Sequence, residues 1–180
     1  VRAIPTSNQV AELAREYGIP LLGRLEGPID LDIDGADEID PDLNLLKGGG
    51  GALAREKLVA EAARRLVVVA DSSKLVERLA RATRLPVEVL PFLWRRTAGR
   101  IEDLGGTASL RGGEDRPFLT DNGNWILDVS VPGGIGDPGG FGSALKALTG
   151  VVDHGLFTGL ARACLVAGEA GVTVLGRLDS

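Results

Sequence analysis

The feature that most constrains the fold is a continuous apolar run at residues 66–70, which reads LVVVA. Such a run, without polar alternation, is typical of a strand covered on both faces, as in a parallel sheet. A helical pattern at residues 52–65 precedes it, and an alternating apolar and acidic pattern at residues 29–33 precedes the helix. This order predicts a right-handed βαβ unit and an α/β, Rossmann-like domain with a parallel sheet. In the first strand, Leu31 and Ile33 are expected to face the core.

The end of that first strand carries four consecutive residues that could contact a ligand: Asp34, Gly35, Ala36 and Asp37. Ten residues after Asp37, Lys47 leads directly into four glycines at residues 48–51, and the helical pattern follows. Glycines before a helix let the backbone approach a ligand closely, and the first helical N–H groups face an anion. One short segment is therefore predicted to gather two carboxylates, a lysine and a cradle of N–H groups.

The helix after the glycines carries a glutamate, Glu56, in an unusual position. On a helical wheel it lies within an apolar stripe formed by Ala52, Leu53, Val59, Ala60 and Ala63. Burial there would raise the pKa of the carboxyl group, whereas Lys47 and the helix N-terminus would lower it. That balance suits a general base. The alternative is an ordinary glutamate of the first turn that serves only the helix dipole.

Lys74 ends the turn Asp71-Ser72-Ser73-Lys74, which follows the apolar strand. Ligands of open α/β sheets bind beyond the carboxyl ends of the strands. Because Asp34 also follows such an end, Lys74 is expected to face the same crevice. A solvated loop lysine is the alternative.

No metal site is predicted. Asp30, Asp32, Asp34 and Gly35 match the opening of a calcium loop, but Pro41 stands where the closing bidentate glutamate is needed. The lone His154 and the single Cys164 cannot assemble a zinc site, so both are interpreted as structural, with Cys164 as a core thiol.

Composition sets further limits. The chain has 180 residues and a formal charge of -5, with its arginines scattered rather than clustered, which argues against a nucleic-acid surface. No apolar stretch approaches membrane-spanning length and no signal peptide is recognisable, so we expect a cytoplasmic protein without membrane contact. The sequence contains no methionine, which is expected of an internal piece of a longer product.

The remaining pattern indicates a second, inserted domain. A capping box with Thr6 as N-cap predicts an early helix that carries Val10 and Leu13 on its apolar face. From residue 86 the order becomes β-α-β-β-α-β, which predicts a ferredoxin-like α+β domain with its second helix at residues 143–148. The glycine-rich residues 133–140 are interpreted as a connecting loop. Residues 156–175 are expected to return to the first sheet, so residues 1–79 and 157–180 form one domain and residues 80–156 the insertion.

Six strings resemble the ribose-5-phosphate isomerase family of the A type, in its order and spacing across nearly the whole chain. They read PTS at residues 5–7, DGADE at 34–38, KGGG at 47–50 with REK at 55–57, ADSSK at 70–74, PVEV at 86–89 and TDNGN at 120–124. The resemblance implies metal-free and cofactor-free interconversion of ribose 5-phosphate and ribulose 5-phosphate. It also implies a Rossmann-like domain with a smaller inserted lid and assembly into homodimers or homotetramers.

Carried over to these positions, the resemblance implies Glu56 as catalytic base. The chemistry of such a reaction then assigns Lys47, with the glycine N–H groups, to the enediolate oxygen, and Asp34 or Asp37 to a second acid/base role. The substrate-binding residues that the resemblance implies are Asp34, Gly35, Ala36, Asp37, Lys47, Gly48, Gly49, Gly50 and Lys74. The family has a phosphate-binding loop upstream of the region that matches Pro5, and this sequence does not contain it, so we expect the polypeptide as given to be impaired. The alternative function is a sugar-phosphate sensor of related fold, which needs binding residues but no base.

Overall fold

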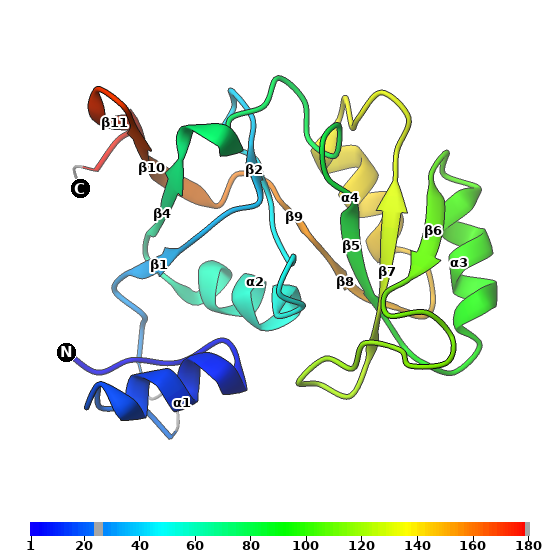
Figure 1. Cartoon of the computed structure of the whole chain (residues 1–180), viewed down its shortest axis with the longest axis horizontal. Coiled ribbons are helices and arrows are strands. Elements are labelled where there is room, and N and C mark those ends of the chain that lie inside the picture. The colour runs from blue at the N-terminus through cyan, green and yellow to red at the C-terminus, as the bar shows by residue number, and fades with distance from the viewer. Residues whose placement is uncertain (24–26, 179–180) are drawn as a thin grey trace.

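The computed structural model describes residues 1–23 and 27–178. It contains three sheets, shown with their helices in Figure 1. None of the helices in these ranges is long and apolar enough to cross a membrane. The first and last parts of the chain build one side of the molecule, and the middle of the chain builds the other.

The predicted parallel sheet is present. Its strands are β1 (Asp32–Asp34), β4 (Leu66–Asp71), β10 (Ala161–Gly168) and β11 (Gly171–Gly176), in the order β1-β4-β10-β11. The first three strands run parallel and β11 returns antiparallel to β10. Helix α2 (Leu53–Ala62) leads into β4, and α1 (Asn8–Glu16) lies near the N-terminus. The α/β, Rossmann-like fold class is therefore confirmed.

The middle of the chain forms a separate antiparallel sheet in the predicted β-α-β-β-α-β order. It consists of β5 (Leu85–Val89), α3 (Trp94–Glu102), β6 (Thr107–Leu110), β7 (Trp125–Ser130), α4 (Pro138–Lys146) and β8 (Val151–His154). The strand order β6-β7-β5-β8 is that of the ferredoxin-like fold. The division of the chain at residues 79/80 and 156/157 stays a prediction, and residues 24–26 and 179–180 of the first predicted domain lie outside the described ranges.

A small third sheet joins the two larger ones. It contains β2 (Glu38–Ile39), β3 (Leu45–Leu46) and β9 (Leu156–Phe157). Because side chains alternate along a strand, Leu45 packs into the core of the parallel sheet while Leu46 packs into the core of the inserted sheet. β9 thus joins this sheet, and β10 and β11 alone make the predicted return to the first one.

Two helix predictions need correction at their starts. The N-cap of α1 is Ser7 rather than Thr6, since the Ser7 hydroxyl accepts a hydrogen bond from the Val10 N–H at 3.1 Å. Val10 and Leu13, which were predicted on the apolar face, are both exposed, whereas Ala11 and Ala14 are buried. Helix α4 begins at Pro138, within the stretch interpreted as a loop, because Asp137 caps it and proline is favourable in the first turn.

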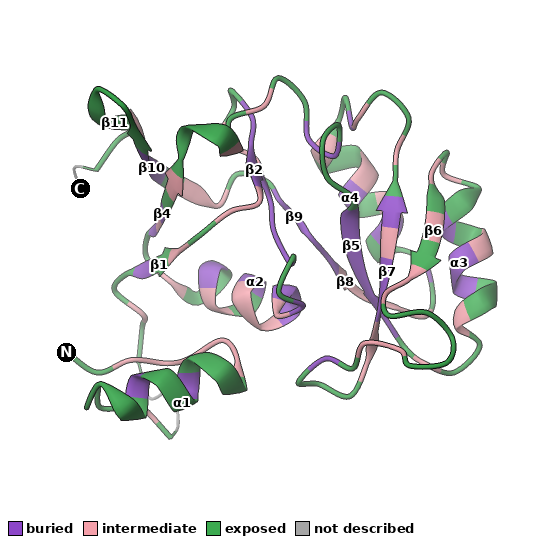
Figure 2. Ribbon diagram, viewed as in Figure 1, coloured by how far each residue is buried: buried purple, intermediate pink, exposed green. Residues whose placement is uncertain are grey.

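The prediction of which face of β1 is buried is also wrong. Asp32 is only 8% exposed, whereas Ile33 is 64% exposed and Leu31 lies before the strand, 42% exposed. The acidic face turns inward because Asp34 pairs with a buried lysine, Lys47, on that side. Val69 of β4 is 50% exposed, so within the described ranges the apolar run is covered on one face rather than two (Figure 2).

Candidate active site

Lys47 lies at the centre of the residues predicted to carry chemistry. It follows β3, and its side chain is buried. Its ammonium lies 2.9 Å from Asp34 Oδ2 and 3.2 Å from Glu56 Oε2, and it donates a hydrogen bond of 2.6 Å to the Gly35 carbonyl. Burial alone would lower the pKa of Lys47, but the two carboxylates outweigh it and raise this pKa. Lys47 is therefore a fixed positive charge.

Glu56 projects from the first turn of α2 toward that charge. Its side chain is 15% exposed. Burial raises the pKa of Glu56, the charges of Asp34 and Asp37 add to this, and Lys47 acts against it. Its Oε2 atom accepts no hydrogen bond in the described part of the chain, although it is ion-paired with Lys47. A carboxylate with a raised pKa can accept a proton from a bound molecule.

The glycines after Lys47 are required by close contacts. Gly48 has a φ of 103°, which disfavours other residues. The Gly49 N–H donates to Asp37 Oδ2 at 2.8 Å, and a Cβ on Gly49 would lie 2.9 Å from the Asp37 carboxylate. Asp37 and the glycine segment are thus held against each other at the mouth of the site.

These residues line a cavity of about 270 Å³: Gly35, Ala36, Asp37, Lys47, Gly48, Gly49, Gly50, Glu56 and Lys74. Asp34 does not line it but reaches it through its ion pair with Lys47. A second hollow of about 290 Å³ shares Asp37, Gly49 and Lys74 and continues toward Arg84 and Arg111 of the inserted domain. The structure thus brings the predicted site residues to one place, with room for a small phosphorylated molecule.

Arg111 was missed by the sequence analysis. Its guanidinium pairs with Asp128 on β7 at 2.5 Å and also donates to the Gly48 and Gly49 carbonyls, both at 3.0 Å. It therefore ties the inserted sheet to the glycine segment. No local signal could have identified it, because the two glycines that it binds are more than sixty residues away in the sequence.

Two further acidic residues near the motifs are structural. Glu38 is buried and accepts hydrogen bonds from the backbone N–H groups of Ala80 and Thr83. Glu88 is buried in β5 and accepts from the side chains of Thr120 and Asn124. Each carboxylate orders a loop, which explains why acidic residues occur in these strings without lining the cavity.

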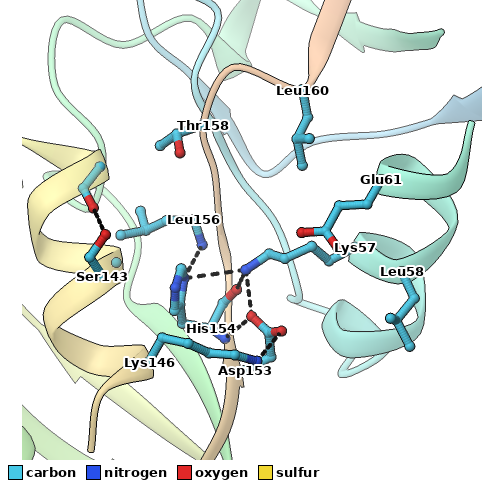
Figure 3. Close-up of a pocket in the computed structure, with 12 residues that line it drawn as sticks. Lys57, Leu58, Glu61, Ser143, Lys146, Asp153, His154, Leu156, Thr158 and Leu160 are labelled. Carbon is cyan, nitrogen blue, oxygen red and sulfur yellow. Dashed lines mark hydrogen bonds and ion pairs between the residues drawn. The ribbon is translucent and has the colours of Figure 1, made fainter. Parts of the chain in front are cut away.

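A larger cavity of about 350 Å³ lies on another side of α2 (Figure 3). There Lys57 Nζ donates to Asp153 Oδ1 and to the His154 carbonyl, both at 2.6 Å, and Lys146 binds the other Asp153 oxygen at 2.8 Å. Burial, with the charge of Lys57, lowers the pKa of His154 to about 4. Both lysines of this cavity are paired with Asp153. The cavity at Glu56 holds, besides the paired Lys47, a second lysine, Lys74, that has no ion pair within the described ranges, so it is the better site for an anionic molecule.

Cys164 is fully buried in β10, as predicted for a core thiol, and burial raises its pKa. Within the described ranges no group of three or more histidine, cysteine or acidic side chains is arranged to hold a metal ion. The centre of the acidic cluster is occupied instead by the Lys47 ammonium.

The family model for ribose 5-phosphate isomerase A (phosphoriboisomerase A) matches residues 2–171. Ribose-5-phosphate isomerase A of Chloroflexus aurantiacus is 51% identical over 171 residues, which cover 94% of this chain and 71% of that protein. Ribose 5-phosphate isomerase from Plasmodium falciparum is similar in structure, with a TM-score of 0.91 and 38% identity over 98% of this chain and 78% of that one.

A D-ribose-5-phosphate isomerase solved in complex with phospho-erythronic acid is equally similar, with a TM-score of 0.91 and 37% identity over 98% of this chain and 78% of that one. Family model, sequence relatives and solved structures agree over nearly the full length of the chain. The chain therefore belongs to the ribose 5-phosphate isomerase A family and is an isomerase.

Proposed function

We propose that the chain interconverts ribose 5-phosphate and ribulose 5-phosphate through an enediolate, with Glu56 as the general base. The observation that carries this proposal is the arrangement of Glu56, Lys47 and Asp34 beside a cavity whose other lining is mostly glycine backbone. Moving a hydrogen between C1 and C2 of a sugar needs one base that reaches both carbons and a positive charge for the oxygen that becomes negative.

In the proposed reaction, Glu56 removes the proton from C2 of the aldose and returns it to C1. The Lys47 ammonium stabilises the enediolate oxygen, and N–H groups of the glycine segment assist it. Asp34, paired with Lys47, is the second acid/base group and moves the hydroxyl proton from O2 of the aldose to O1, which becomes the hydroxyl of the ketose. These steps need no metal, because a fixed ammonium supplies the positive charge.

The substrate phosphate is proposed to lie toward Lys74, the one lysine that borders both adjoining hollows. The similar isomerase solved with phospho-erythronic acid supports a phosphorylated sugar acid or sugar as the class of ligand. A cytoplasmic location and assembly into homodimers or homotetramers remain predictions. The sensor alternative is not proposed further, since the relatives are isomerases and a sensor has no use for a buried base.

The experiment is Glu56→Gln in the enzyme, with Glu61→Gln, an exposed position on the same helix, as the matched control. Glu56→Gln should lower kcat by about a hundredfold to ten-thousandfold and leave substrate binding nearly intact, because only proton transfer is lost. Glu61→Gln should behave as wild type. Turnover by the Glu56 variant above about a tenth of the wild-type rate would remove Glu56 from the role of base.

A further inference from the structure

The two peptide groups that follow Gly48 are held in one orientation by the side chain of Arg111. Its Nη1 atom donates to the carbonyls of Gly48 and Gly49, both at 3.0 Å. The Gly48 carbonyl also accepts a hydrogen bond from the Gly51 N–H at 2.9 Å, which closes a turn over residues 48–51. Both carbonyls therefore lie on the same side of this turn and face the guanidinium.

The N–H groups of the same two peptide groups point the other way. Because the peptide bonds of the described ranges are trans, each N–H is directed opposite to the carbonyl of its own peptide group. The Gly49 N–H donates to Asp37 Oδ2 at 2.8 Å. The Gly50 N–H is directed away from Arg111 and makes no hydrogen bond with the described residues. Since Gly50 lines the cavity at Glu56 and Arg111 lies outside it, a molecule bound in that cavity can reach this N–H.

The guanidinium of Arg111 is itself fixed from the inserted sheet. The Arg111 side chain is 17% exposed, its Nε donates to Asp128 Oδ2 at 3.0 Å, and its Nη2 donates to Asp128 Oδ1 at 2.5 Å. The guanidinium lies 5.6 Å from the centre of the Phe118 ring. A planar guanidinium that binds a carboxylate through two nitrogens and two carbonyls through the third is restricted to a single orientation. The glycine carbonyls are thus held by a rigid donor.

Resting on the proposed function, we propose that Arg111 is a positioning residue for the reaction. By holding two glycine carbonyls, it directs the Gly50 N–H toward the oxygen that becomes negative in the enediolate. Lys47 supplies a positive charge to that oxygen, and the N–H adds a hydrogen bond of fixed direction. Such a donor stabilises the transition state only if it is in place before the reaction, and a displacement of about 1 Å can cost roughly a hundredfold in rate. The inserted domain therefore contributes to the reaction through a residue that does not touch the substrate.

The test compares Arg111→Met with Arg100→Met, which removes the same charge from an exposed position on α3. Steady-state kinetics give kcat and KM for ribose 5-phosphate. NMR follows the Gly50 amide proton while phospho-erythronic acid, whose carboxylate carries a negative charge like that of the enediolate, is added to saturation. In the wild type and in Arg100→Met this proton should move downfield. In Arg111→Met the downfield shift should be lost, and kcat should fall by roughly tenfold to a hundredfold while KM changes less than about twofold.

A purely structural Arg111 would lower the stability of the protein and leave the Gly50 response at saturation unchanged, and that result overturns the inference. A wild-type Gly50 proton that the acid does not shift, or a wild-type kcat in Arg111→Met, overturns it as well. If Glu56→Gln keeps its turnover while Arg111→Met loses both kcat and the Gly50 response, Glu56 is not the base and the inference on Arg111 stands. Should Arg111→Met fail to fold, Asp128→Asn takes its place, because it removes the charge that anchors the guanidinium: a weaker Gly50 response supports the inference, and an unchanged one refutes it.

Discussion

At the scale of single residues, Asp32 is a side chain whose burial is poorly compensated. Because its carboxyl pKa is raised to about 6 from 3.8, the folded state holds the proton more tightly than the unfolded state does. This contribution to stability is complete below the unfolded pKa and is lost as the pH rises through about 6. The unfavourable free energy of burying an ionised carboxylate thus arises near the candidate base, and perturbed pKa values of this kind are common at functional sites.

Asp32→Asn should therefore stabilise the protein at alkaline pH, because the amide stays neutral. We expect a gain of about 1–3 kcal/mol near pH 8, about half of that near pH 5, and almost none near pH 3.5, which lies below the unfolded pKa. Thermal unfolding followed by circular dichroism at the three pH values measures the difference. A variant that is destabilised equally at all three would show that the carboxylate has packing or hydrogen-bonding roles that override its charge.

At the scale of elements, the order of strands and helices could be predicted, whereas three local details were missed by the sequence analysis. The apolar run of β4 and the glycine segment before α2 are contiguous signals, so the βαβ unit and the site at its end follow from the sequence. The face of β1 depends on Lys47, which lies on another strand and draws the acidic side inward. The first turn of α4 is rich in glycine, which is typical of a loop, although Asp137 and Pro138 before it are a recognisable start signal for a helix. Arg111 depends on contacts that no local pattern encodes.

Helix α2 is held from outside as well as by its own hydrogen bonds. Lys57, next to Glu56, joins it to β8 through Asp153, and its ammonium lies 5.0 Å from the centre of the Phe157 ring. Lys57→Met should destabilise the protein by about 2–4 kcal/mol, because it leaves a partly buried carboxylate and a carbonyl without their shared partner. Lys146→Met, which removes a more exposed ammonium from the same Asp153, should cost less than about 1 kcal/mol. Urea unfolding of both variants provides the comparison, and equal losses would contradict it.

At the scale of the whole molecule, side chains in the described ranges tie the inserted domain to the region of the candidate site at three places. Arg111 binds the glycine segment, Lys57 of α2 binds β8, and Arg55 of α2 donates to Asn122 Oδ1 at 2.8 Å. The small sheet adds a shared wall, since its two faces pack into different cores. The insertion therefore acts as a support for the site.

Native-state hydrogen exchange can test this coupling. Arg111→Ala should lower the opening free energy of the amides at residues 48–51 by about 1–3 kcal/mol, because two charged hydrogen bonds to their carbonyls are lost. Amides of β4 and β10 should keep their protection. Arg100→Ala, an exposed position on α3, is the control and should leave the glycine segment unchanged. Unaltered exchange in Arg111→Ala would mean that the segment is held without the inserted domain.

The hydrogen bond between Gly155 and Pro86 joins the two ends of the inserted domain, and this has a consequence for replacing that domain. The Gly155 N–H donates to the Pro86 carbonyl at 2.8 Å, so the chain leaves the inserted domain where it entered. For the parallel-sheet domain, the whole insertion is equivalent to one long surface loop. Lengthening such a loop adds little to the conformational entropy lost when its ends are brought together. The inserted domain can therefore be exchanged, or its size changed, by joining a new segment at Pro86 and Gly155. The Lys47 N–H, however, donates to the Gly155 carbonyl at 2.8 Å, and a side chain at Gly155 would overlap the Lys47 carbonyl. Any transplanted domain has to keep that glycine, because the hydrogen bond from Lys47 to Gly155 also sets the position of Lys47.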